Sequence, residues 1–228
     1  IGENIIISGG SGLYVQAVLG MISDTPETDT HIRDTILARA ENRGWPALFK
    51  EIQSIDPEYA KTIDSKNPKR ICRALEIWES TGKKPSEIFQ EKQNNFPHPY
   101  LMIGLNPKRE FLYKRIDQRV LDMIQVGLVD EVKNLLQKGY TRDLNALNTV
   151  GYKEILAYLD GEIDLDKAIS DIQKHTRHFA KRQKTWFRKY APDVWISFDE
   201  NDDFAYIFDQ AKALVIKKIG NLLSVKDC

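Results

Sequence analysis

Residues 29–95 show helical patterns only, whereas the segments before and after them contain strand patterns. This order of patterns constrains the fold more than any other feature of the sequence. Within residues 29–95, Gly44 follows one helical pattern, and two later patterns begin at Asp56-Pro57 and Asn67-Pro68, where Asp56 and Asn67 are predicted N-caps. Asn106-Pro107 is predicted to cap a further helix in the same way. Strand patterns occur at residues 5–8 before this stretch and at 100–105 and 193–198 after it. We therefore predict an α/β core formed by residues 1–23 and 98–228, interrupted by a helical domain of residues 24–97.

The glycine-rich segment near the start has the layout of an anion site. In "IIISGGSGLY", residues 5–14, an apolar strand pattern runs into adjacent glycines and then into a helix. Backbone N–H groups and a helix N-terminus can meet an anion in such a layout. The letters fit neither G-x-G-x-x-G nor G-x-x-x-x-G-K-[ST], so a phosphate neighbourhood and a plain tight turn both stay open.

The strand pattern of residues 5–8 also predicts that other strands lie beside it in a sheet. A strand as apolar as residues 5–8 is usually interior to a sheet, where strands pair with it on both sides. The chain starts with Ile1, four residues before that strand. We expect that an N-terminal piece of the protein precedes it.

Composition excludes several classes of protein. The chain has 228 residues, a hydrophobic content of 42% and equal numbers of acidic and basic residues, 33 each. Its apolar runs are too short to cross a bilayer, and its start does not resemble a secretory signal. Two cysteines form no disulfide framework. We expect a cytoplasmic protein without a membrane partner.

The charges are unevenly distributed, and one predicted helix is strongly basic. Residues 169–190 hold seven Lys or Arg and one acid, whereas residues 193–209 hold six acids and no base. The basic stripe of this helix, at helical spacing, consists of Arg177, Lys181, Lys184 and Arg188. Its predicted apolar stripe consists of Ile172, Phe179, Trp186 and Tyr190.

Two explanations fit the basic helix. A solvated face is the ordinary one, but such a face usually mixes both signs of charge. A nearly pure positive face with interleaved aromatic residues favours contact with a nucleic-acid backbone. Lys69, Arg70 and Arg73 would supply a second basic patch.

Arg119 is predicted on the apolar stripe of another helix. Leu112, Ile116 and Met123 lie at i, i+4 and i+11, and Arg119 occupies position i+7. An unpaired buried charge is costly, so the side chain either reaches water or a carboxylate, or meets a bound phosphate. The residues alone leave these alternatives open. The sequence shows no His-x-x-x-His pair, no sign of a Ser-His-Asp arrangement and no acidic pair with metal-binding spacing, and residue chemistry therefore names no reaction.

Five segments, in this order, resemble the tRNA dimethylallyltransferase (tRNA isopentenyltransferase) family. They are "GGSGLYVQAVL", "NPKRICRALEIWESTGKKPS", "LYKRIDQRVLDMIQVGLVDEV", "NTVGYKEILAYLDGE" and "TRHFAKRQKTWFRK". The resemblance implies a P-loop-NTPase-like parallel-sheet core with an inserted all-helical domain. It further implies transfer of a dimethylallyl group from dimethylallyl diphosphate to N6 of the adenosine 3′-adjacent to the anticodon in tRNA. Mg²⁺ is implied as the ion that helps the diphosphate leave.

The resemblance also implies roles for individual residues. Arg119 matches the family arginine that contacts the diphosphate, and Gly10, Ser11 and Gly12 match the segment that borders the substrate channel. The first segment that would touch the tRNA anticodon stem-loop consists of Lys69, Arg70, Ile71, Cys72 and Arg73. The second consists of Asn148, Thr149, Val150, Gly151, Tyr152 and Lys153. The third consists of Lys181, Arg182, Gln183, Lys184, Thr185, Trp186, Phe187 and Arg188.

Two parts of the family pattern have no counterpart in this sequence. The family's P-loop and its general-base aspartate both precede the segment that matches GGSG. We expect these 228 residues alone to be inactive, and to act as a monomer. The alternatives are a non-catalytic nucleic-acid-binding module and a relative of P-loop nucleotide kinases; the basic helix speaks against the kinase.

Overall fold

The structure, a computed structural model, describes residues 5–22, 25, 27, 29–90, 96–189 and 193–224. The chain divides into two compact units, residues 1–98 and residues 99–228, and each has a hydrophobic core of its own. The predicted assignment of residues 1–23 to the α/β core, and of residues 24–97 to an inserted domain, stays a prediction.

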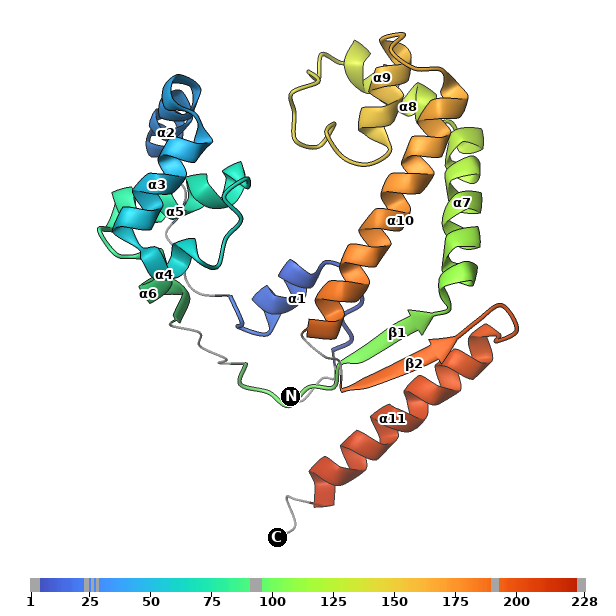
Figure 1. The fold of residues 1–228 in the computed structure, drawn as a ribbon. Helices are drawn as coiled ribbons and strands as arrows, with labels where there is room; N and C mark the ends of the chain where they lie inside the picture. The colour runs from blue at the N-terminus through green and yellow to red at the C-terminus, as the bar shows by residue number, and fades with distance from the viewer. Residues whose placement is uncertain are drawn as a thin grey trace. The chain divides into compact units, whose positions relative to one another are not determined.

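All regular secondary structure among the described residues of the first unit is helical (Figure 1). Its elements are α1 (Gly12–Val18), α2 (Thr30–Arg43), α3 (Trp45–Ile55), α4 (Pro57–Ala60), α5 (Pro68–Thr81) and α6 (Pro85–Gln90). The predicted caps are confirmed at α4 and α5. The Asp56 side chain accepts the Tyr59 N–H at 3.0 Å, and the Asn67 side chain accepts the Arg70 N–H at 3.2 Å.

The core of this unit gathers the apolar faces of α2, α3 and α5. Ile36, Leu48 and Ile71 are fully buried there, and Ile52 and Leu75 nearly so. Because the apolar residues of α5 recur at helical spacing, one face of that helix enters the core. The opposite face carries Lys69 and Arg70 into solvent.

The second unit combines a two-stranded sheet with five helices among its described residues. The elements are β1 (Ile103–Pro107), α7 (Arg109–Val126), α8 (Leu128–Gln137), α9 (Tyr152–Leu159), α10 (Leu165–Lys189), β2 (Val194–Phe198) and α11 (Phe204–Ser224). The strands are parallel and in register from Ile103 opposite Val194 to Pro107 opposite Phe198. Parallel strands need a long crossover, and here α7 to α10 form that connection. Both strands were predicted, and the structure confirms them with small shifts of their ends.

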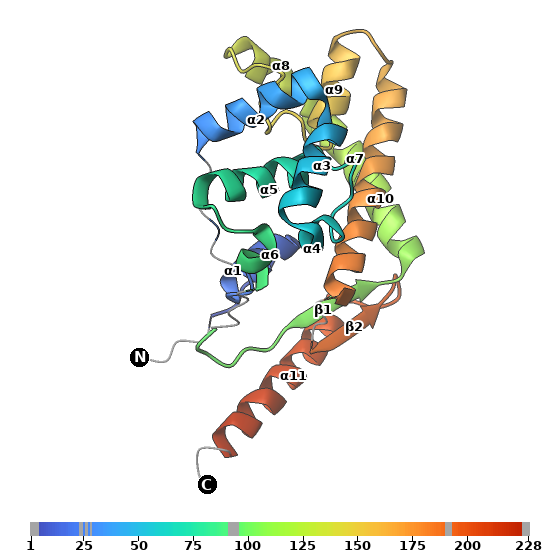
Figure 2. The ribbon, with the colours of Figure 1, turned by 60° about the vertical axis from the view of Figure 1, so that its left-hand side comes forward.

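The core of the second unit lies where α7, α8, α9 and α10 meet. Val120, Val132, Ile155 and Ile172 are among its most deeply buried residues. Helices α7 and α10 run side by side in both views (Figure 1 and Figure 2). Helix α11 packs along β2. None of the described helices has an apolar stretch long enough to span a membrane.

Two local predictions are wrong. Residues 5–8 form no strand, and the side chain of Ile6 is 93% exposed. A strand exists only where its backbone pairs with a neighbour, and no described residue pairs with this segment. Asn106 does not cap α7: it lies in β1 and its Nδ2 donates to Ser197 Oγ at 2.9 Å, while α7 begins after Lys108.

Candidate functional site

Helix α10 carries most of the candidate site, and its predicted basic stripe divides into two parts. Arg177 forms an ion pair with Asp117 of α7, and its guanidinium lies 5.8 Å from the centre of the Tyr113 ring. Gln173 also donates to the backbone carbonyl of Asp117, at 3.2 Å. Arg177 therefore joins α10 to α7, and the prediction that it belongs to an open cationic surface is wrong.

The remaining cations of this stripe are not neutralised within the described part of the chain. Lys181 and Arg188 are exposed, and Lys184 is half-buried. None of their side chains forms an ion pair or a hydrogen bond with a described residue, whereas the backbone carbonyl of Lys181 accepts from the Thr185 hydroxyl at 3.0 Å. Three neighbouring cations without a carboxylate partner make this end of α10 strongly attractive to an anion.

A cavity of about 250 Å³ lies at the same end of α10. Its lining residues are Asn106 of β1, Trp195 of β2, and Lys184 and Arg188 of α10. Two cations and an amide around one cavity are suited to an anionic group such as a phosphate.

The predicted apolar stripe of α10 is only partly buried. Ile172 is buried in the core, whereas the Phe179 side chain is 48% exposed and Trp186 is half-buried. The α10 residues in the core, Ala168 and Ile172, lie in the first half of this helix. Tyr190, the last member of the predicted stripe, lies outside the described residues.

Residues 148–153, the second predicted tRNA segment, are held against α10 within the same unit. Gly151 has a φ of 103°, which favours glycine, and α9 begins at the next residue. The buried Glu154 carboxylate accepts the Gly151 N–H at 2.7 Å and lies 2.6 Å from Nδ1 of His175 on α10. The Tyr152 hydroxyl donates to Glu131 of α8, and this hydrogen bond raises the pKa of Tyr152.

These contacts fix the backbone of the segment and leave other side chains exposed. Asn148, Thr149, Val150 and Lys153 point their side chains into solvent. A segment with an anchored backbone and exposed side chains can bind a partner at little cost in conformational entropy.

Arg119 of α7 is exposed, which corrects its predicted place on an apolar face. The buried residues around it are Ile116 and Val120, and Arg119 lies beside that stripe. It forms no hydrogen bond or ion pair with a described residue. The Arg119 guanidinium is therefore not neutralised by a carboxylate within the described chain.

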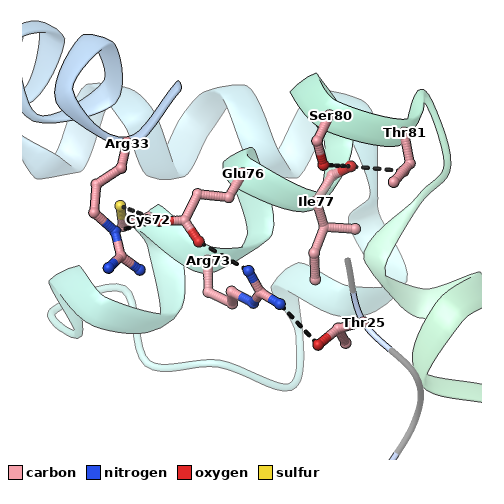
Figure 3. Close-up of polar contacts among 8 residues, drawn as sticks. All are labelled: Thr25, Arg33, Cys72, Arg73, Glu76, Ile77, Ser80 and Thr81. Atoms are coloured by element: carbon pink, nitrogen blue, oxygen red, sulfur yellow. Dashed lines mark hydrogen bonds and ion pairs between the residues drawn. The ribbon is translucent and has the colours of Figure 1, made fainter. Parts of the chain in front are cut away.

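In the first unit, the segment from Lys69 to Arg73 divides into exposed and buried residues. Lys69 and Arg70 are exposed, whereas Ile71 and Cys72 are buried in the core. The Arg73 guanidinium contacts Glu76 at 3.1 Å and donates to Thr25 Oγ1 at 2.7 Å (Figure 3).

Glu76 is the centre of this network, with 2% of its surface exposed. Its carboxylate accepts from Arg33 Nε at 2.6 Å and from Cys72 Sγ at 3.5 Å (Figure 3). Burial works to raise the pKa of Glu76, but the hydrogen bonds from Arg33 and Arg73 outweigh it and lower that pKa. Burial raises the pKa of the Cys72 thiol to about 11, and Glu76 adds to the effect.

The glycine-rich turn of residues 9–12 leads into α1. Ser11 is the N-cap residue of α1 and its side chain makes no capping hydrogen bond, and Gly12 is the first helical residue. A role of Gly10, Ser11 and Gly12 at a substrate channel stays a prediction. Among the residues that the structure describes, no three His, Cys, Asp or Glu side chains form a group that could hold a metal ion.

Sequence reasoning missed two buried carboxylates. Glu154 follows Gly151 by three residues, which is the spacing of a helix N-terminal capping glutamate, so a signal was present. Glu76 sits within the apolar run of α5, and nothing in the pattern distinguishes it from an exposed acid.

Comparisons with known proteins identify the family of this chain. The sequence profile of the family described as IPP transferase matches residues 1–190. A tRNA dimethylallyltransferase of Christiangramia forsetii is 44% identical over 207 residues, covering 91% of this chain and 68% of that protein. A tRNA dimethylallyltransferase of Thermotoga maritima is 39% identical over 219 residues, covering 96% of this chain and 70% of that protein.

Solved structures give the same result for the fold. The full-length tRNA isopentenylpyrophosphate transferase of Bacillus halodurans aligns with a TM-score of 0.60 and 33% identity. The alignment covers 95% of this chain and 67% of that one. The chain thus spans about two thirds of the length of the relatives that it matches.

Proposed function

The chain belongs to the IPP transferase family, and from this premise we propose that it transfers a dimethylallyl group from dimethylallyl diphosphate to tRNA. The acceptor in this proposal is N6 of the adenosine next to the anticodon on its 3′ side. The helix-rich fold with a small parallel sheet is that of the family, whose members have a P-loop-like core.

The transfer forms a bond between adenine N6 and the first carbon of the dimethylallyl group, and it breaks the bond from that carbon to the diphosphate. N6 is a poor nucleophile and loses a proton as the bond forms, while negative charge grows on the departing diphosphate. We assign the stabilisation of that charge to Arg119. Its exposed guanidinium, without a carboxylate partner among the described residues, supports this role.

The observation that carries the proposal is the unneutralised positive charge on the last three turns of α10. Lys181, Lys184 and Arg188 would contact the phosphates of the anticodon stem-loop. In the first unit, Lys69 and Arg70 are exposed and would add contacts, whereas the buried Ile71 and Cys72 would support the helix that presents them.

Mg²⁺ belongs to the proposal, since the family is generally metal-dependent. The described residues do not fit a magnesium site, because no three ligating side chains lie together among them. No step of the transfer is therefore assigned to the ion. A monomeric state and a cytoplasmic location, where tRNA is found, complete the proposal.

The test is direct. The full-length protein is incubated with unmodified tRNA and dimethylallyl diphosphate, and the digested tRNA is analysed by mass spectrometry. We expect one adenosine per tRNA to gain a dimethylallyl group. Stable binding of tRNA without this product in the full-length protein would contradict the proposal and favour a non-catalytic binding module.

A further inference from the structure

Phe179 is a large apolar side chain in an unusual position. Its ring is 48% exposed on α10, two turns beyond Ile172, which is buried. The residues one helical turn away on the same helix are His175, Thr176, Arg182 and Gln183, and all four are polar. Phe179 is therefore isolated among polar groups and does not extend the apolar face that enters the core.

Arg182 lies over this ring. Its guanidinium carbon is 5.7 Å from the centre of the Phe179 ring, a cation–π arrangement. Arg182 is exposed, and no ion pair or hydrogen bond joins it to a described residue. One aromatic face and one planar cation are thus presented together to solvent.

Phe179 lies between the two segments of this unit that we propose to contact tRNA, and Arg182 belongs to the second of them, residues 181–188. One turn before Phe179, His175 meets Glu154, which anchors residues 148–153. Just after it, Lys181 begins the row of cations that ends at Arg188. An RNA strand that reached from one segment to the other would pass this ring.

We propose that Phe179 and Arg182 form a platform on which one unpaired base of the bound RNA stacks. Every base has a π face, and single-stranded RNA is commonly held by stacking on aromatic rings and guanidinium planes while cations hold its phosphates. A protein or lipid partner would require a continuous apolar patch, whereas this ring is surrounded by polar and basic side chains. The inference rests on the proposed function, because it adds a base contact to the same RNA surface.

The experiment uses an anticodon stem-loop hairpin with 2-aminopurine at successive loop positions, titrated with the full-length protein. The variants are Phe179→Tyr, Phe179→Leu and Phe179→Ala, and circular dichroism checks their folding. We expect Phe179→Tyr to retain the affinity and the quenching of 2-aminopurine at one loop position. We expect Phe179→Leu and Phe179→Ala to bind about tenfold more weakly and to lose that quenching.

A matched control is available on α11. Phe208 is also an exposed aromatic residue, at 54%, but it lies within the acidic stretch of residues 193–209. Phe208→Ala should leave RNA affinity unchanged. The salt dependence of binding should also be the same for wild type and Phe179→Ala, because stacking releases no counterions.

The outcomes separate this inference from the proposed function. Full affinity in Phe179→Ala, in a protein that still binds and modifies tRNA, would overturn the platform alone. Full affinity in Phe179→Leu with reduced affinity in Phe179→Ala would overturn it as well, since apolar packing would then suffice. If the wild-type protein binds no hairpin and modifies no tRNA, both proposals fail.

Discussion

Glu76 illustrates, at the scale of single residues, how a buried acid is kept charged. Its carboxylate is almost inaccessible to solvent, and it would prefer the neutral form if it stood alone. Arg33 and Arg73 donate to both oxygens and reverse that preference. The bond from Arg33 to Glu76 thereby connects α2 to α5, and Arg73, on α5 itself, further reaches Thr25.

The lowered pKa of Glu76 predicts a pH-dependent contribution to stability. A carboxyl whose folded pKa lies below its ordinary value of 4.5 stabilises the fold above that value. The contribution is lost as the pH falls through the folded pKa. We expect Glu76→Gln to lower the free energy of unfolding by about 1–3 kcal/mol at neutral pH. The difference from wild type should vanish in acid.

Urea unfolding from about pH 7 to about pH 3 measures this difference. Glu41→Gln is the matched control, because Glu41 is exposed on the neighbouring α2. A difference between Glu76→Gln and wild type that stays constant across the whole range would contradict the assignment.

Cys72 should be chemically inert in the folded protein. With a pKa of about 11, only about one molecule in a thousand carries the thiolate at pH 8, and the side chain is buried. We expect iodoacetamide to leave Cys72 unmodified in native protein and to modify it in urea, as measured by peptide mass spectrometry. Native modification at the rate of a free thiol would show that this core opens readily.

At the scale of elements, the Glu154 side chain joins the turn before α9 to His175 of α10, beside the apolar contacts between the two helices. Glu154→Ala would leave the buried Gly151 N–H without its acceptor, which costs about 1–3 kcal/mol. Glu154→Gln keeps an acceptor oxygen and should retain most of the stability. Hydrogen exchange at the Gly151 amide gives the readout: protected in wild type and Glu154→Gln, unprotected in Glu154→Ala.

Glu162→Ala, at an exposed position of the same region, serves as the control for that experiment. Equal protection of the Gly151 amide in Glu154→Ala would mean that the turn is held by other contacts.

The last turns of α10 predict a specific dependence on salt. Each lost phosphate contact lowers the slope of log affinity against log salt concentration by about one, so replacing Lys181, Lys184 and Arg188 with alanine should lower it by about three. The control replaces Lys212, Lys217 and Lys218 of α11, which removes the same charge elsewhere. An unchanged slope in the α10 variant would mean that its cations form an ordinary solvated face.

Elements with local signals could be predicted from the sequence, and those that depend on tertiary partners could not. Asp56 and Asn67 mark helix starts because their side chains bond to backbone N–H groups a few residues away. The apolar pattern of residues 5–8 predicts a strand only if a partner strand pairs with it. Asn106 precedes a helix in the sequence, but pairing of β1 with β2 extends the strand through it.

In the candidate site, too, features with a local sequence signal were predictable and tertiary contacts were not. Helical spacing placed Lys181, Lys184 and Arg188 on one side of α10, and the structure leaves them without carboxylate partners among described residues. Spacing could not reveal that Asp117 lies opposite Arg177, since that contact joins residues far apart in the sequence. Nor could it reveal that Phe179 lies beyond the end of the core.

At the scale of the whole molecule, two proposed tasks fall to separate side chains of the second unit. Arg119 on α7 would stabilise the leaving diphosphate, and the cations of α10 would hold the RNA. The Asp117–Arg177 pair joins these two helices, so both groups are carried by one packed framework. The 44% identity to a tRNA dimethylallyltransferase places the chain in a family in which both substrates must meet.

Two-substrate steady-state kinetics of the full-length protein tests this division most directly. For Arg119→Ala we predict a kcat lower by about a hundredfold or more, with the Kd for tRNA within about twofold of wild type. For the Lys181, Lys184 and Arg188 triple variant we predict a raised KM for tRNA and an unchanged KM for dimethylallyl diphosphate. If Arg119→Ala instead weakened tRNA binding as much as it slowed transfer, or if the triple variant lost kcat without a change in KM for tRNA, the division would be contradicted.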